Sequence, residues 1–157
     1  LYGAVSFGYN WVNPKSPRSS RFRGSNYSLN LSVRPDDRLS VDLLASRSSD
    51  LSNNVFATFT VTEVYSLNGT YALDQRLRFN FGSSIQRRDF GLGLANDLSG
   101  FLTNDEFIRA YGGAVFNLNR RLRLNALVSQ QRRKSDNPIF NYTNTTVSAG
   151  VSLALGR

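Results

Sequence analysis

The chain has 157 residues and a net charge of +8, carried almost wholly by Arg, and it contains no Cys, Met or His. The lack of Cys excludes disulfides and thiol chemistry, and the lack of His excludes Ser-His-Asp triads and His-containing metal sites. No apolar run approaches the roughly 20 residues of a transmembrane helix, which excludes a helical membrane protein. We therefore expect no enzymatic activity, no cofactor and no metal.

Alternation of polar and apolar residues predicts eight strands. In chain order they cover about 1–12, 26–34, 38–47, 55–73, 76–90, 105–118, 121–133 and 141–155. Four long connections alternate with three short ones, so both ends of the predicted sheet lie on the short-turn side. Because residue 1 is Leu and the strand pattern begins at once, we expect a mature or truncated piece of a longer protein.

The three short turns repeat one pattern: a polar turn, then Arg-Leu, then apolar/polar alternation. The copies are Pro35-Asp36-Asp37-Arg38-Leu39, Leu73-Asp74-Gln75-Arg76-Leu77 and Leu118-Asn119-Arg120-Arg121-Leu122. Short turns between alternating strands predict an antiparallel meander. Turns that are short on one side and long on the other are typical of outer-membrane barrels, whose short turns are periplasmic.

Each predicted strand has one apolar face and one face of Ser, Gly, Asn and Thr with some Arg. In the last strand, for example, Val147, Val151 and Leu153 oppose Ser148 and Ser152. Such a polar face carries too few charges for the outside of a soluble protein and suits a hydrated lumen. We predict an all-β, up-and-down transmembrane β-barrel of eight strands, one domain over 1–157 or the C-terminal part of a larger barrel. A soluble β-sandwich or calycin-like barrel is the alternative.

Four charged residues are predicted to point into the lumen: Asp42, Arg78, Arg109 and Arg123. The three Arg either line an anion-preferring path or form a structural ion-pair network with Asp42. We expect Asp42 itself to pair with a cross-strand Arg, such as Arg34 or Arg78. Glu63 falls on the apolar face and is expected at the outer interface, where a charge costs less than at the midplane.

A second basic group is predicted toward the long-loop side. Its members are Arg87, Arg88, Arg132, Arg133 and Lys134. They either contact phosphates of lipopolysaccharide or an acidic polymer, or form a solvated rim. The adjacent acids Asp36-Asp37 and Asp105-Glu106 are poor acid/base pairs for glycoside hydrolysis, because neighbours on a strand point to opposite faces.

The repeated turns, together with the closing stretches 129–138 and 141–151, resemble outer-membrane β-barrel proteins encoded near exopolysaccharide genes, the "β-barrel porin 2" or EpsL-like group. Members of that group are generally longer, which implies that this chain is a C-terminal portion of a larger barrel. The chain departs from many such barrels by ending in Leu155-Gly156-Arg157 rather than in an aromatic residue. The resemblance implies a location in the outer membrane of Gram-negative bacteria and carries over no functional residues.

Three functions compete at this point. The first is a porin-like or polysaccharide-export channel, with outer-membrane lipid, lipopolysaccharide, anionic polysaccharide, a secretion partner or a second copy of the chain as partners. The second is a non-conducting anchor, adhesin or scaffold barrel. The third is a soluble basic β-domain that binds nucleic acid. We do not expect nucleic acid, because the aromatics lie on the aliphatic face, away from most Arg.

Overall fold

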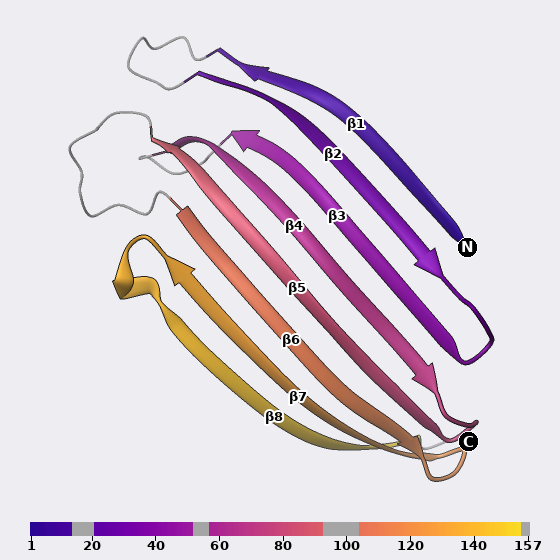
Figure 1. The fold of residues 1–157 in the computed structure, drawn as a ribbon. Coiled ribbons are helices and arrows are strands. Elements are labelled where there is room, and N and C mark those ends of the chain that lie inside the picture. Colours follow the sequence, from indigo (N-terminus) through magenta and orange to yellow (C-terminus); the bar gives the residue numbers. More distant parts are fainter. Residues whose placement is uncertain (14–20, 52–56, 93–103, 155–157) are drawn as a thin grey trace.

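The computed structural model describes residues 1–13, 21–51, 57–92 and 104–154 as one antiparallel sheet in which each strand pairs with the next along the chain (Figure 1). The strands are β1 (Tyr2–Val12), β2 (Phe22–Val33), β3 (Leu39–Leu51), β4 (Ala57–Ala72), β5 (Leu77–Leu92), β6 (Asn104–Asn117), β7 (Leu122–Ser135) and β8 (Tyr142–Leu153), with a short 3-10 helix η1 (Pro138–Phe140) before β8. The predicted eight-stranded antiparallel meander is confirmed.

Two strands extend four residues further than the sequence predicts. β2 begins at Phe22, because Phe22 pairs with Val12 of β1, and β3 continues to Leu51, because Leu51 pairs with Phe59 of β4. Ser and Asp near the end of β3 disfavour a strand by local propensity, but the hydrogen bonds to β4 override that preference. The pairing of β2 with β3 ends earlier, at Tyr27 and Arg47, so the outer ends of these two strands separate.

The sheet is curved and open (Figure 1). Within the described ranges no pairing joins β1 to β8, and both strands present an unpaired edge. The first residue of β1 and the last residue of β8 lie on the side of the short turns. An eight-stranded sheet of this connectivity is an arc that has the order and strand directions of an up-and-down barrel.

The sheet has almost no hydrophobic core. Among the described residues, Phe22 and Val61 are the only hydrophobic side chains that are buried. Phe22 packs on Phe59, with 4.8 Å between the ring centroids, where the outer ends of β2 and β3 separate. Large side chains elsewhere are exposed, such as Phe7 at 77% and Val147 at 73%. One sheet with no second layer cannot bury its apolar face by itself, which argues against a soluble β-sandwich.

The repeated sequence pattern corresponds to a repeated turn geometry. In each turn an Asp or Asn carboxyl or amide oxygen accepts two backbone N–H groups: Asp36 from Arg38 and Leu39, Asp74 from Arg76 and Leu77, and Asn119 from Arg121 and Leu122, all at 2.7–2.8 Å. The backbone carbonyl of the Arg in each turn accepts a hydrogen bond from a backbone N–H at the end of the strand that follows that hairpin, as Arg76 does from Asn117 at 2.8 Å. The side chain therefore replaces missing ladder bonds, which explains the conserved order Asx-x-Arg-Leu within this chain.

Asp74 makes this turn pH-dependent. The N–H groups of Leu77 and Arg76 favour the charged carboxylate and lower the pKa of Asp74. Since the folded pKa lies below the unfolded one, the carboxylate stabilises the fold above the unfolded pKa of about 4, and that contribution is lost as the pH falls through the folded value. The measurement is the urea midpoint of unfolding in detergent micelles as a function of pH. We expect Asp74→Asn, which keeps the acceptor oxygen, to reduce the fall of this midpoint at acidic pH. Asp37→Asn removes the same charge without removing a turn bond, and should keep the wild-type profile.

Candidate functional site

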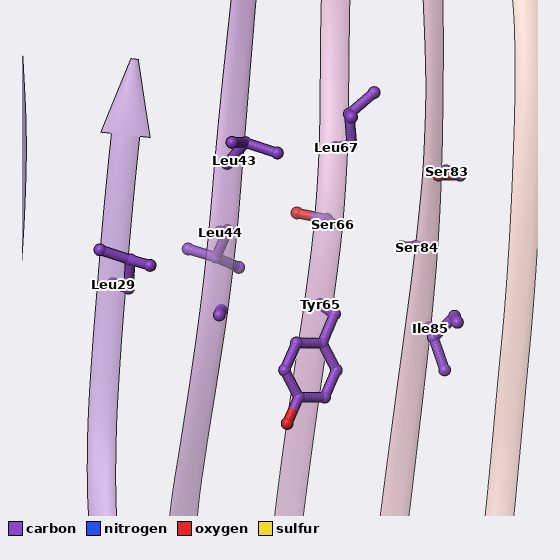
Figure 2. Close-up of a pocket in the computed structure, with 10 residues that line it drawn as sticks. Leu29, Leu43, Leu44, Tyr65, Ser66, Leu67, Ser83, Ser84 and Ile85 are labelled. Atoms are coloured by element: carbon purple, nitrogen blue, oxygen red, sulfur yellow. The ribbon is translucent and has the colours of Figure 1, made fainter. Parts of the chain in front are cut away.

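The register of the sheet defines two faces with different chemistry. Residues that are direct cross-strand partners form a row, and their side chains point to the same face. One such row crosses six strands and consists of Val5, Leu29, Ala45, Tyr65, Ile85 and Ile108. This row belongs to what we call the apolar face, on which a shallow groove of about 370 Å³ runs between β2 and β5. Figure 2 shows Leu29, Leu43, Tyr65, Leu67 and Ile85 around this groove. An exposed apolar surface that covers several strands is the mark of a face made for contact with lipid or protein.

The polar face lies on the other side of the same strands. One of its rows holds Asn30, Leu44, Ser66, Ser84, Arg109, Gln131 and Asn144. Apolar exceptions on this face include Leu44, Val115 and Leu127. Tyr111 covers Gly82, where an added Cβ would lie 2.6 Å from its ring, and donates its hydroxyl hydrogen bond to Asn68 Oδ1 at 2.9 Å. The polar face is therefore packed with small and amide side chains.

All four candidate lumen charges lie on the polar face. Asp42 lies in the cross-strand row that runs through Asn68 and Gly82 to Tyr111. Arg78 is on the strand of Gly82 and Arg109 on the strand of Tyr111, each an even number of residues away, so both side chains point to the same face. Arg123 pairs with Asn117, which is six residues from Tyr111 on β6. The four residues occupy four different rows along the strands. They are distributed from the short-turn end to the middle of the face.

The predicted ion pair of Asp42 is wrong. Its carboxylate Oδ1 accepts a hydrogen bond from the hydroxyl of Ser32 on β2, and no Arg within the described residues lies within ion-pair distance of it. Ser32 is the direct cross-strand partner of Asp42, whereas Arg34 and Arg78 belong to other rows. Neighbours in the same row come closest on a pleated sheet, so the hydroxyl takes the place expected for a guanidinium.

The predicted outer basic group is divided between the two faces. Arg88 and Arg133 lie on the polar face, whereas Arg87, Arg132 and Lys134 lie on the apolar face. Arg132 shares a row with Val5 and Tyr65, so the apolar band crosses the rows diagonally from β1 to β7. Transmembrane strands tilted by about 35–45° produce this offset, because the bilayer boundary cuts across the hydrogen-bonded rows.

A cross-strand row of residues with alternating charge borders the apolar face on the side of the long loops. Its members, in strand order from β3 to β7, are Arg47, Glu63, Arg87, Glu106 and Lys134. Arg47 and Glu63 approach to 3.5 Å, and Arg87 Nε donates to Glu106 Oε2 at 2.8 Å. Opposite charges directly across strands stabilise a pair. Glu63, the acid that interrupts the apolar pattern, therefore belongs to a neutralised row at the edge of the apolar band.

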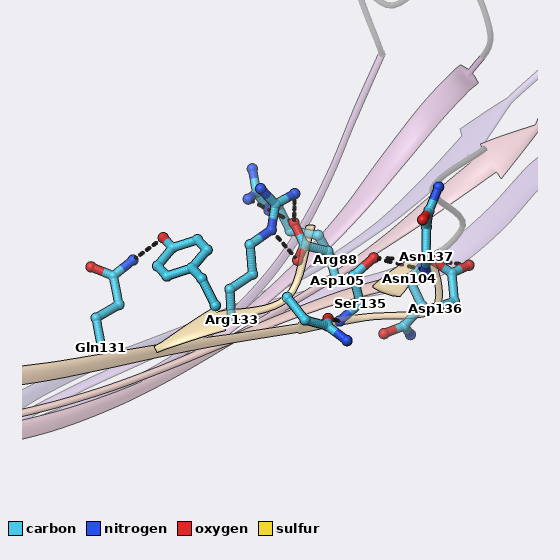
Figure 3. A network of polar contacts seen from close by, with 10 residues as sticks. Arg88, Asn104, Asp105, Gln131, Arg133, Ser135, Asp136 and Asn137 are labelled. Atoms are coloured by element: carbon cyan, nitrogen blue, oxygen red, sulfur yellow. Dashed lines mark hydrogen bonds and ion pairs between the residues drawn. The ribbon is translucent and has the colours of Figure 1, made fainter. Parts of the chain in front are cut away.

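The strongest electrostatic cluster lies on the polar face of β5–β7. Asp105 is fully buried and accepts hydrogen bonds from Arg133 Nε and Nη2, both at 2.9 Å, and from Arg88 Nη2 at 3.1 Å. The Phe107 ring lies under both guanidinium groups, at 4.6 Å from Arg88 and 5.0 Å from Arg133. Figure 3 shows Arg88, Asp105 and Arg133 meeting on one side of the sheet. We call these four residues the Asp105 clamp.

The Asp105 clamp adjoins an ordered connection between β7 and β8. Asn141 Oδ1 accepts from the backbone N–H of Ser135 at 2.6 Å, and Arg133 stacks on Phe140 of η1 at 5.1 Å. Sequence reasoning assigned Arg88 and Arg133 to a rim and missed Asp105 as their partner. The register, which places Arg88 opposite Asp105, was the missing information.

Comparison with known proteins gives one clear result. A family model described as "Putative beta-barrel porin 2" matches residues 1–155, and the chain belongs to this family of β-barrel porins. Membership in this porin family implies a location in the outer membrane. No curated protein and no solved structure matches the chain. In the part of the chain that the structure describes, no helix is long and apolar enough to cross a membrane.

Proposed function

We propose that the eight strands form the wall, or an arc of the wall, of an outer-membrane channel whose polar face lines the path. One observation carries this proposal: the sheet has an exposed apolar face opposite a face rich in small polar side chains and Arg. The apolar face contacts lipid in this arrangement, and closing the open edges leaves no unpaired backbone in the hydrocarbon. The short turns are then periplasmic, and the row from Arg47 to Lys134 lies at the outer interface.

The charges on the polar face favour anions. Arg78, Arg109 and Arg123 have no ion-pair partner among the described residues, and Asp42 is the one acid of the predicted lumen set. Unpaired guanidinium groups along a water-filled path attract anionic solutes. Anionic polysaccharide is the solute class that fits both this charge and the small polar wall. Lipopolysaccharide phosphates are the expected ligands of Arg132 and Lys134 on the outer side of the apolar face.

Conductance in planar bilayers tests the proposal. We expect the refolded chain to conduct and to prefer chloride over potassium in a salt gradient, and the triple variant Arg78→Gln, Arg109→Gln, Arg123→Gln to shift the reversal potential toward cation preference. Arg132→Gln, on the apolar face, is the matched control and should leave the selectivity unchanged. Properly folded protein without channel events would contradict the channel and leave the non-conducting scaffold barrel.

A further inference from the structure

The three short turns share one geometry but differ in charge. Over equivalent positions, residues 34–40 contain two Arg and two Asp, residues 72–78 two Arg and one Asp, and residues 117–123 three Arg and no acid. The change at the third turn is direct, because Asn119 replaces Asp36 and Asp74 while making the same two backbone bonds. The positive charge of this end of the sheet is therefore concentrated at the β6–β7 turn.

This turn covers a pocket. The pocket has a volume of about 270 Å³, and the polar residues that line it are Asn117, Asn119, Arg120, Arg121, Arg123 and Ser152. A pocket of about 430 Å³ at the β2–β3 turn has a similar place but contains Asp36 and Asp37 beside its Arg side chains. Of these two pockets, the one at the third turn has no acidic residue in its lining, which Leu122, Leu153 and Ala154 complete.

The third turn is held in place by backbone bonds, and the guanidinium group of Arg123 is oriented by a side-chain bond. Arg121 is fixed through its backbone, since its N–H donates to Asn119 Oδ1 and its carbonyl accepts from Ala154 N, both at 2.8 Å. Arg123 is oriented by its Nε, which donates to Asn117 Oδ1 at 3.0 Å. Within the described residues, neither Arg120 nor Arg121 forms a side-chain ion pair. A pre-arranged donor set loses less entropy when it binds.

We propose that the β6–β7 turn pocket is an anion-binding site that takes a phosphate group of a polyanion at the short-turn end of the sheet. Planar guanidinium groups bind phosphate through paired N–H donors. Binding at this site is a property separate from the proposed channel activity, because the pocket lies at the turn and does not depend on a solute crossing the barrel. Three guanidinium groups line the pocket and match the several acceptor oxygens of a phosphate better than the two of a carboxylate, so the ligand is a phosphate-bearing chain.

Calorimetric titration of the full chain in zwitterionic detergent micelles tests the site. We use tripolyphosphate as the phosphate probe and oligoglutamate as the carboxylate probe. The double variant Arg120→Gln, Arg121→Gln should weaken binding of tripolyphosphate by about tenfold or more, since even one lost charged hydrogen bond costs about 1.4 kcal/mol. The matched control Arg34→Gln, Arg38→Gln removes the same charge from the first turn and should change the affinity by less than about twofold.

A milder variant separates binding from folding. Asn119→Asp keeps the acceptor that the turn needs, as Asp36 and Asp74 show, and adds one negative charge beside the pocket. We expect an unchanged urea midpoint and a several-fold weaker affinity. Equal losses in the first-turn and third-turn double variants, tighter binding of oligoglutamate than of tripolyphosphate, or no binding of either probe by the wild type would overturn the proposal.

Discussion

Leu67→Arg is expected to destabilise the folded protein in lipid vesicles by about 2–4 kcal/mol, which is the cost of a charged side chain on the lipid face at the bilayer midplane. Leu67 lies near the middle of the apolar face of β4, between Glu63 at the outer charged row and the turn at Asp74. The measurement is urea unfolding in phosphatidylcholine vesicles, followed by tryptophan fluorescence of Trp11.

Two further variants identify lipid as the cause. Ser66→Arg changes the adjacent residue, which points to the polar face, and should alter the stability by less than about 1 kcal/mol. Leu77→Arg changes the apolar face next to the short turn, where the expected cost is also about 0–1 kcal/mol because the side chain reaches the interface. Equal losses at Leu67 and Leu77 would contradict lipid contact and indicate packing against protein.

Asp105→Asn is expected to cost about 3 kcal/mol, because it leaves two guanidinium groups of the clamp without their shared carboxylate. We place the value at the low end for a buried pair, since the side chains of Arg88 and Arg133 are 32% and 20% exposed. Urea unfolding in the same vesicles measures the loss. A shift below about 1 kcal/mol would show that the clamp behaves as an exposed ion pair.

The neighbouring residue supplies the control for Asp105. Glu106→Gln removes one carboxylate from the opposite face, where its partner Arg87 is 55% exposed, and should cost less than about 1 kcal/mol. A double-mutant cycle with Arg133→Gln should give a coupling of about 1 kcal/mol or more between Asp105 and Arg133. Additive effects of the two substitutions would rule out a functional clamp.

Local patterns predicted the architecture well. Period-two alternation located all eight strands, and the Asx-x-Arg-Leu repeats located the three short turns. The alternation also placed Asp42, Arg78, Arg109 and Arg123 on one face, because side-chain direction along a strand depends only on parity. These features depend on residues close in the chain, which is why they can be read from it.

The charged contacts depend on the register between paired strands, which the alternation pattern of the sequence does not determine. The row from Arg47 to Lys134 and the clamp at Asp105 each join residues that are 16 or more positions apart. A shift of pairing by two residues would keep every side chain on its face and change every ion pair. For this reason the Asp42 pairing was predicted wrongly while its face was predicted correctly.

The side-chain bonds of the short turns also bear on the order of folding. Each turn is closed by bonds between residues no more than four positions apart, such as Leu73 N to Leu77 O at 3.0 Å, and such short closures cost little chain entropy. The hairpins β2–β3, β4–β5 and β6–β7 can thus form on the microsecond timescale of isolated hairpins, about 1–10 μs. The longer connections then join these three hairpins to each other and to β1 and β8, so the slow steps of assembly belong to the long-loop side of the sheet.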